Sequence, residues 1–295
     1  MTQAPILIAG ATGMNGRALI DALRKTGGAA VRALVRDPAK ARLGDDVEVV
    51  QGDLADPASL ARAFDGIDKA YIVTAIQPGT LSLFRNFFDA AKAADVKHVV
   101  KFSGLGSSVD SPSKVIRQHG ASDDLLRGSG LRYTILRPNS FHQNMLGQAA
   151  SIAGTGQFYL PLGNARQSTI DVRDIAEITA KILMEDGHEG HAYDLTGPES
   201  LNFHDVAEIL GEVRGAPVSY VPISRTAMKD ALKQAGFASW PASVLAEIMD
   251  LFSTGAYAGV LPDAERLLGR PPRSFRAFAQ DHANHWSPDG SAANS

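Results

Sequence analysis

The sequence predicts an α/β protein with a doubly wound parallel sheet, joined to a smaller, mainly helical C-terminal cap. Three observations lead to this prediction. Short apolar runs alternate with longer helical patterns over the first 140 residues, a glycine motif follows the first apolar run, and helical patterns dominate after about residue 141. With 295 residues, of which 44% are hydrophobic, the chain is long enough to form a large core.

The sheet is predicted from short apolar or β-branched runs that helical patterns separate. We expect strands at Ile6–Ala9, Val31–Val35, Val47–Val50, Ala70–Thr74, Val99–Phe102 and Tyr133–Leu136. Helices are expected near Asn15–Lys25, Pro57–Phe64, Leu81–Ala94, Ser113–Gly128 and Asp171–Met184. Alternation of this kind builds βαβ units, so we assign residues 1–155 to a core that residues 166–187 rejoin.

Residues 188–286 are assigned to the cap, where helices are expected from Asn202 to about Val213 and at Ser224–Ala235 and Val244–Tyr257. The polar stretch 287–295 is predicted to be a disordered tail. Large apolar side chains in the second half suit a planar ligand, and we expect one or two of them to face it: Phe158, Trp240, Phe252 and Tyr257.

Composition and charge exclude several functions. With 29 basic and 32 acidic residues, the net charge of -3 indicates neither a nucleic-acid partner nor an anionic membrane surface. The absence of cysteine excludes disulfides, thiol nucleophiles and cysteine-ligated zinc. The pairs His188/His191 and His282/His285 have H-x-x-H spacing without the glutamate of a zinc protease, so no metal site is predicted. No apolar run reaches the roughly 18 residues of a membrane span, and the N-terminus lacks the basic region of a signal peptide, so a cytoplasmic protein is expected.

Gly10, Gly13 and Gly16 follow the first predicted strand at G-x-x-G-x-x-G spacing and open the first predicted helix. In such a motif the glycines permit a tight turn, a close approach of the backbone to a pyrophosphate, and close packing of helix on strand. Thr12, Met14 and Asn15 share this loop and are expected to contact the nucleotide. An ordinary glycine-rich turn is the alternative, but six strand patterns in the right order favour a Rossmann-type dinucleotide site.

The residues after the second predicted strand indicate which dinucleotide binds. An acidic residue there reads a free ribose hydroxyl, whereas a basic residue reads a 2′-phosphate. Arg36 occupies this position, with Lys40 one turn further on and Arg17 as a further phosphate partner, so the sequence predicts NADPH. The alternative is that all three are solvated surface charges. Asp53 and Leu54 are expected to border the adenine, although Asp53 also suits a turn.

Six segments together resemble the NmrA-like group of atypical short-chain dehydrogenases/reductases, which includes type 2 quinone oxidoreductases and triphenylmethane reductase. They are GATGMNGR (10–17), LVRDPAKA (34–41), GDLAD (52–56), SGLRYTILRPNSF (129–141), YDLTGPE (193–199) and LLGRPPRSF (267–275). The resemblance implies a Rossmann core with a small C-terminal cap and a substrate cleft between them. It also implies that loops after the fourth, fifth and sixth strands border the nicotinamide, through Thr74, Ala75, Ser103, Arg137, Pro138, Asn139 and Phe141.

The usual catalytic pair of short-chain dehydrogenases, Tyr-x-x-x-Lys, is absent, because Val115 and His119 stand at its two positions. Without that acid we expect hydride transfer to an acceptor that needs none, such as a quinone, an activated alkene or a cationic dye. The alternative is a non-catalytic sensor that binds NADP(H) and signals to a partner. We favour a reductase acting on a small planar, quinone-like acceptor, and a homodimer is an allowed assembly.

His119 is the one ionisable group in that frame and is a candidate proton relay, with a structural or ribose hydrogen bond as the alternative. Asn139 is a second catalytic candidate, and His142, which follows the nicotinamide loop, is a weaker one.

Overall fold

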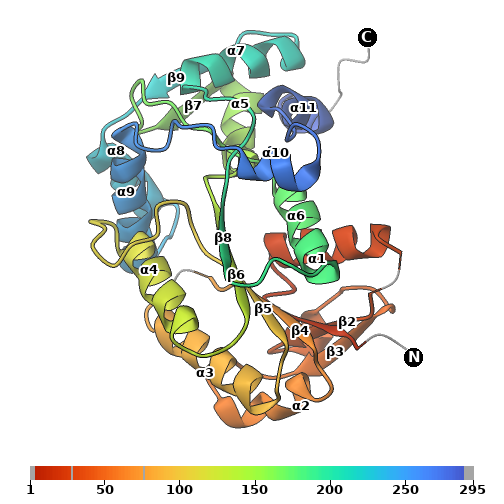
Figure 1. Cartoon of the computed structure of the whole chain (residues 1–295). Helices are drawn as coiled ribbons and strands as arrows, with labels where there is room; N and C mark the ends of the chain where they lie inside the picture. Colours follow the sequence, from red (N-terminus) through yellow and green to blue (C-terminus); the bar gives the residue numbers. More distant parts are fainter. Residues whose placement is uncertain (1–3, 28, 76, 289–295) are drawn as a thin grey trace. The chain divides into compact units, whose positions relative to one another are not determined.

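Among the residues that the computed structural model describes, 4–27, 29–75 and 77–288, seven strands form one sheet in the order β3-β2-β1-β4-β5-β6-β8 (Figure 1). The strands are β1 (Ile6–Ala9), β2 (Val31–Val35), β3 (Val47–Gln51), β4 (Lys69–Ile72), β5 (His98–Phe102), β6 (Tyr133–Pro138) and β8 (His191–Leu195). The pairs from β3 across to β6 are all parallel. The predicted doubly wound α/β fold is therefore confirmed.

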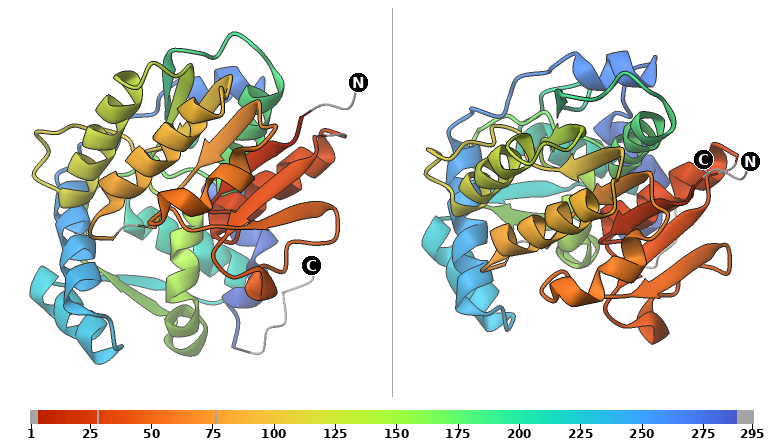
Figure 2. Two further views of the ribbon diagram at one scale, coloured as in Figure 1. Left: turned by 90° about the horizontal axis from the view of Figure 1, so that it is seen from below. Right: turned by 60° about the horizontal axis from the view of Figure 1, so that its bottom comes forward.

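The helices that connect the strands of this sheet include α1 (Met14–Lys25), α2 (Ala61–Phe64), α3 (Thr80–Ala93), α4 (Lys114–Arg127) and α6 (Val172–Met184). The helix expected at Pro57–Phe64 begins as a 3-10 turn, Pro57–Ser59, which Asp56 caps by accepting from the Ala58 amide. One face of the sheet is buried under α2, α3 and α4, where Phe64, Phe84 and Phe87 pack against apolar strand residues. Two further views show α3 and α4 along this face (Figure 2).

The chain divides into two compact units. The first comprises residues 1–111, 115–138 and 175–194, and the second comprises 112–114, 139–174 and 195–295. Residues 139–155 and 166–174 thus group with the second unit, although they are assigned to the core above, and residues 188–194 group with the first unit, although they are assigned to the cap. Strand β8 accounts for part of this difference, because its short and partly exposed sequence HAYDL carries no apolar run that predicts a strand.

The second unit contains the 3-10 segment η3 (His142–Gln148) and the elements α5 (Ala149–Thr155), β7 (Gln157–Leu160), α7 (Phe203–Arg214), β9 (Ser219–Pro222), α8 (Arg225–Gln234), α9 (Ser239–Ser253), α10 (Asp263–Leu268) and α11 (Phe275–Asp281). The expected helix start at Asn202 is confirmed, because Asn202 and Asp205 form a reciprocal capping box. The parallel pair of β7 and β9 was not predicted. Helix α9 begins five residues earlier than expected and ends before Gly255.

The LLGRPPRSF segment (267–275) donates several hydrogen bonds to a buried carboxylate of the second unit. Asp174 is fully buried and accepts from the guanidinium groups of Arg270 and Arg273 and from the Arg273 amide. Three donors satisfy the charge, which would otherwise be costly to bury. The predicted disordered tail falls largely on residues 289–295, which lie outside the described residues.

Within the described residues, no helix is both long and apolar enough to cross a membrane. The same part of the chain contains no cluster of three histidine or acidic residues suited to a metal ion.

Candidate functional site

A cavity of about 580 Å³ in the first unit lies where β1 to β4 end. It brings together most of the residues predicted to bind the nucleotide: Gly10, Thr12, Gly13, Met14, Asn15, Arg36, Asp53, Leu54, Thr74 and Ala75. The position agrees with the ligand crevice of open α/β sheets, at the carboxyl ends of the strands. Gln77 and Leu83, which the sequence did not single out, also line it.

Glycine occupies positions 10, 13 and 16 for different reasons. Gly10 has φ +86°, and a Cβ there would lie 2.3 Å from the Val73 carbonyl oxygen. Gly16, which was predicted to bind the cofactor, is not among the residues that line the cavity. A Cβ on Gly16 would lie 2.3 Å from the Gly10 carbonyl oxygen, so glycine at this position allows α1 to pack on the loop. Gly13 has an ordinary φ of -79°, and a Cβ there would meet the Gly10 oxygen at 3.5 Å. The fold itself therefore requires Gly10 and Gly16, and only a ligand gives a reason for glycine at position 13.

The start of α1 is suited to an anion. Gly13 is the N-cap and supplies no side-chain cap, and the first turn contains no acidic residue. The amides of Met14 and Asn15 are among the first N–H groups of a helix, which lack intrahelical partners and lie at the positive end of its dipole. Among the described residues, Oδ1 of Asn15 is buried without a hydrogen-bond partner, so the protein itself leaves this acceptor unused. A dinucleotide, which has a pyrophosphate and ribose hydroxyls, fits these groups.

The structure separates the three basic residues predicted to read a 2′-phosphate. Arg36 is exposed and lines the cavity. Lys40 is not part of the cavity wall, and its ammonium pairs with Asp37 at 2.9 Å. Arg17 donates to the main-chain oxygens of Thr12, Ala41 and Arg42 at 2.9–3.0 Å. The guanidinium of Arg17 therefore ties α1 to the loop after β2, and Arg36 is the cation offered to a ligand.

Asp53 combines both roles considered for it. Its Oδ1 accepts from the Ala55 amide at 2.9 Å, which is a turn hydrogen bond, and the residue also lines the cavity. The next residue, Leu54, is held by its carbonyl oxygen, which accepts from Nδ2 of Asn86 at 2.8 Å.

His119 lies beside the nucleotide cavity but is poorly suited to act as a proton relay, which is one of the two roles considered for it. It lines a niche of about 10 Å³ together with Thr74 and Ala75, which also line the main cavity, and with Val115. Burial, aided by the nearby Lys101 ammonium, lowers the pKa of His119 to about 3. An imidazole with such a pKa is neutral at physiological pH, so it cannot act as a cationic acid.

The sequence missed a buried ionic network in the first unit. Nζ of Lys101 lies 2.8 Å from Oδ1 of Asp123, and both side chains are fully buried. Asp123 also accepts from the hydroxyls of Ser103 and Ser107, at 2.8 and 2.7 Å, and from Arg137 at 3.2 Å. Ser103 and Arg137, which we expected to border the nicotinamide, thus hold Asp123. The one available signal was a lysine inside the apolar strand pattern VVKF.

Asn139, predicted to act in catalysis and cofactor binding, is instead part of the framework of the second unit. It is 3% exposed, and its Nδ2 donates to the Ser168 carbonyl and hydroxyl and to the Tyr257 carbonyl at 3.0–3.2 Å. Its Oδ1 accepts from the Ser140 amide at 2.8 Å. The amide is therefore fully used by the protein, which the sequence could not reveal because Tyr257 is distant along the chain.

Pro138 and Phe141 also differ from expectation. The carbonyl oxygen of Pro138 accepts from the Leu105 amide at 2.9 Å, which closes the end of β6. Phe141 lines a second cavity, described next.

The second unit contains a mainly apolar cavity of about 600 Å³. Its wall includes Phe203, Met228, Leu232, Met249, Phe252 and Phe275. Of the four aromatic residues predicted to face a ligand, Phe252 lies in this wall, whereas Phe158 is fully buried against Phe203 and Tyr220. The cavity is large enough for a molecule of two or three fused rings.

His142, Thr169 and Gln167 are polar residues in this wall. Nε2 of His142 lies 3.2 Å from the Arg273 carbonyl oxygen, which can only accept, so Nε2 carries the proton. Its Nδ1 then accepts from the Thr169 hydroxyl at 2.8 Å. Burial lowers the pKa of His142, which keeps the ring neutral.

Comparison with known proteins agrees with this geometry. A family model described as NAD(P)H-binding matches residues 10–186. An NAD(P)H azoreductase of Xenophilus azovorans is 38% identical over 280 residues, which cover 94% of this chain and 98% of the relative. The structure of Escherichia coli quinone oxidoreductase 2 with NADPH is 31% identical, has a TM-score of 0.85, and covers 94% of this chain and 99% of its own. Citrobacter triphenylmethane reductase with NADP(H) is 29% identical with a TM-score of 0.85, at 94% and 99% coverage.

The fold and the nucleotide cavity define a Rossmann-type dinucleotide-binding protein. The chain belongs to the NAD(P)H-binding family, and its motifs resemble the NmrA-like group of atypical short-chain dehydrogenases/reductases. Because these relatives are NAD(P)H-dependent oxidoreductases, the chain is a member of a family of such enzymes.

Proposed function

We propose that this protein is an NADPH-dependent reductase that transfers hydride to a small planar acceptor such as a quinone, without a protein acid. The observation that carries this proposal is the combination of two cavities. One is a nucleotide cavity beside which His119 is neutral, and the other is an apolar cavity of about 600 Å³. A neutral, conjugated acceptor suits such surroundings better than a simple ketone, whose reduction yields an alkoxide that must be protonated.

The preference for NADPH is supported by Arg36. Its guanidinium stands at the end of β2, in the cavity wall, where an acidic residue would otherwise read a free ribose. A charged donor recognises a phosphate through short, strong hydrogen bonds. The amides at the start of α1 and the turn around Asp53 are proposed to hold the pyrophosphate and the adenosine.

Bound NADPH supplies the hydride. The proposed role of this chain is to orient the nucleotide in the cavity of the first unit and to hold the acceptor among the apolar residues of the second. Addition of hydride to a quinone leaves an oxygen anion that the ring stabilises, and water can protonate it afterwards. Neither step requires the Tyr–Lys pair that Val115 and His119 replace.

The named substrates of relatives support this acceptor class. These relatives include an azoreductase, a quinone oxidoreductase and a triphenylmethane reductase. A further relative, a reductase of a furanone phosphate from Streptomyces griseus, is 34% identical over 289 residues. These substrate classes are all conjugated, so the hydride can add with the charge delocalised.

The test is consumption of NADPH, followed by its near-ultraviolet absorbance, with a panel of a quinone, an azo dye, a triphenylmethane dye and an enone. We expect turnover of at least one acceptor, faster with NADPH than with NADH at subsaturating nucleotide. Tight NADPH binding without turnover of any acceptor would contradict the reductase and favour the nucleotide sensor.

A further inference from the structure

The apolar cavity of the second unit contains one buried polar group that the protein leaves unused. Gln167 lines this cavity and is 3% exposed. Within the described part of the chain, Nε2 of Gln167 is buried and has no hydrogen-bond partner. A buried donor without a partner destabilises a protein, so natural proteins rarely keep one unless a ligand or another group completes it.

The backbone of Gln167 is by contrast fully paired. Its amide donates to the Leu201 carbonyl at 2.8 Å, and its carbonyl accepts from the Leu201 amide at 3.0 Å. This antiparallel bridge fixes the Cα of Gln167, and therefore the start of its side chain, beside the cavity. The backbone is thus held by the fold, while the terminal amide can still turn about its side-chain torsions.

Several other polar side chains of the wall have partners within the protein, including Asn144, which donates to the Ser140 hydroxyl at 2.9 Å. His142 and Thr169 hydrogen-bond to each other at 2.8 Å. Oε1 of Gln148 accepts from the Tyr159 amide at 3.4 Å. Because most of the remaining wall is apolar, we expect a ligand that satisfies Gln167 to be largely apolar and to carry an oxygen or nitrogen acceptor.

We propose that Gln167 is a specificity-determining residue whose side-chain amide turns toward the cavity and donates its N–H to a carbonyl oxygen of an apolar ring compound bound there. The inference rests on the proposed function in identifying this compound with the acceptor, but the binding event itself needs neither NADPH nor hydride transfer. A site with an unmet donor discriminates strongly against an analogue that lacks the acceptor atom, because the donor then stays unpaired.

The experiment measures binding of two ring compounds that differ by one carbonyl, 1-tetralone and tetralin, by calorimetry in the absence of nucleotide. The protein is compared with Gln167→Met, which keeps the length of the side chain and removes the amide. We expect the ratio of the tetralin Kd to the tetralone Kd to fall roughly 3- to 10-fold in the variant, as expected for the loss of one hydrogen bond. The matched control is Gln148→Met, which removes an amide from the same wall and should change this ratio less than about twofold.

Thermal unfolding separates recognition from a structural role. If the amide has no protein partner, Gln167→Met should leave Tm unchanged or raise it by up to about 4 °C. A fall of several degrees, or an unchanged Kd ratio in the folded variant, would overturn the proposal. Should the methionine variant fail to fold, the side-chain NH₂ resonances of Gln167 in the unmodified protein provide the second measurement. They should shift with tetralone and not with tetralin, and equal shifts would also overturn it.

The two proposals fail separately. Carbonyl discrimination that depends on Gln167, together with absence of turnover, would keep this inference and reject the reductase. Turnover of quinones with equal kcat/KM in the unmodified protein and Gln167→Met would keep the reductase and reject this inference. Because the chain contains no cysteine, quinone substrates cannot form thiol adducts that would confuse the second measurement.

Discussion

Nζ of Lys101 lies 2.8 Å from Oδ1 of Asp123 in an ion pair that solvent does not reach. Burial by itself would raise the pKa of Asp123, but the Lys101 ammonium and hydrogen bonds from Lys101, Ser107 and Ser103 lower it below the usual value. The carboxylate therefore stays ionised. Lys101 also lies over the ring of Phe84, 4.6 Å from its centroid, and so connects the ion pair to the apolar core.

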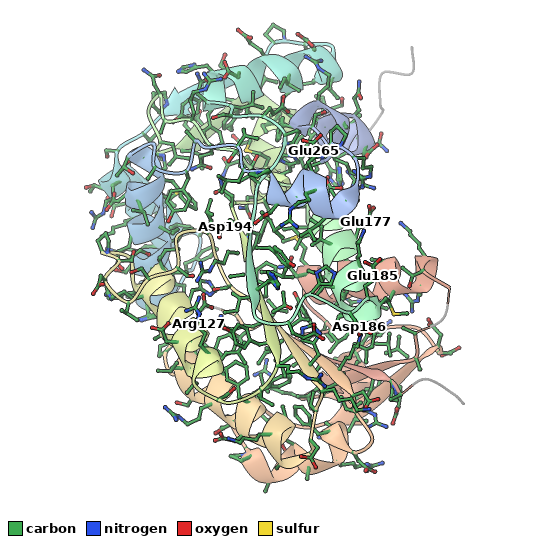
Figure 3. The ribbon with its side chains drawn as sticks, viewed as in Figure 1. Arg127, Glu177, Glu185, Asp186, Asp194 and Glu265 are labelled. Carbon is green, nitrogen blue, oxygen red and sulfur yellow. The ribbon has the colours of Figure 1, made fainter. Side chains whose placement is uncertain are left out.

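We expect Lys101→Met to lower the free energy of unfolding by about 3 kcal/mol, because it leaves the Asp123 charge buried with fewer partners. Urea unfolding measures this change. The double variant Lys101→Met with Asp123→Leu should recover most of the loss, since both charges are then removed. The matched control is Asp124→Asn, which breaks the surface pair with Arg127 at the end of α4 (Figure 3) and should cost less than about 1 kcal/mol. A single variant as stable as the unmodified protein would contradict the importance of the pair.

Arg36→Ala should weaken NADPH binding by about 10- to 100-fold, since hydrogen bonds to charged groups contribute about 1.5–3 kcal/mol. NADH binding should change little, because NADH lacks the 2′-phosphate. Lys40→Ala is the control, since Lys40 pairs with Asp37 and is not part of the cavity wall. Fluorescence titration with both nucleotides decides the matter, and equal affinity of the unmodified protein for NADPH and NADH would refute this assignment.

Gly13→Val should abolish nucleotide binding and leave the protein folded, because Gly13 is exposed, has an ordinary φ of -79° and has space for a Cβ. Gly16→Val should destabilise the fold itself, because its Cβ would lie 2.3 Å from the Gly10 carbonyl oxygen. Circular dichroism and nucleotide titration on the same samples distinguish the two effects. Tight binding by Gly13→Val would mean that the loop is only a turn.

The stability of the protein should fall as the pH is lowered from about 7.5 to 5.5. Thr134 donates to the His188 carbonyl at 2.6 Å, so it accepts from Nε2 of His98 at 2.9 Å, which leaves Nδ1 of His98 unprotonated. Burial lowers the pKa of His98 to about 4. The unfolded chain therefore binds this proton near pH 6.5 and the folded protein does not, so stability is complete above that pH and is lost below it.

We expect His98 to lower the free energy of unfolding at pH 5.5 by about 1 kcal/mol relative to pH 7.5. This contribution should disappear in His98→Asn, because asparagine cannot take up the proton. Urea unfolding of both proteins at the two pH values measures it. The same pH dependence in both would show that His98 is protonated in the folded state.

His119→Ala should lower turnover of a quinone less than about tenfold, because a working general acid contributes about 10²–10⁴ and a histidine with a pKa of about 3 is not one. The rate should also lack an inflection near pH 6.5, the usual pKa of histidine. If His119→Ala instead lost a hundredfold in kcat with unchanged NADPH affinity, and an inflection near pH 6.5 vanished with it, His119 would be the proton donor.

The nucleotide site could be predicted from the sequence because its requirements are local. Gly10 needs a positive φ, Gly16 needs a close approach to a residue six positions earlier, and Arg36 directly follows a strand. The capping box of Asn202 and Asp205 is readable for the same reason, since both partners lie within one helical turn. Strand β8 was missed because its sequence lacks an apolar pattern and its place in the sheet depends on β6, far away along the chain.

By itself the sequence thus determined the fold class, the family and the glycine loop proposed to bind the nucleotide, where each residue interacts with its neighbours in the chain. Only the tertiary structure decided what Asn139, Ser103 and Gln167 do. Asn139 bonds to Tyr257, Ser103 bonds to Asp123, and Gln167 keeps an unmet donor in an apolar wall. Their partners, or the lack of one, arise from contacts between distant segments. A polar side chain reads the same in a sequence whether a remote residue satisfies its hydrogen bonds or leaves them for a ligand.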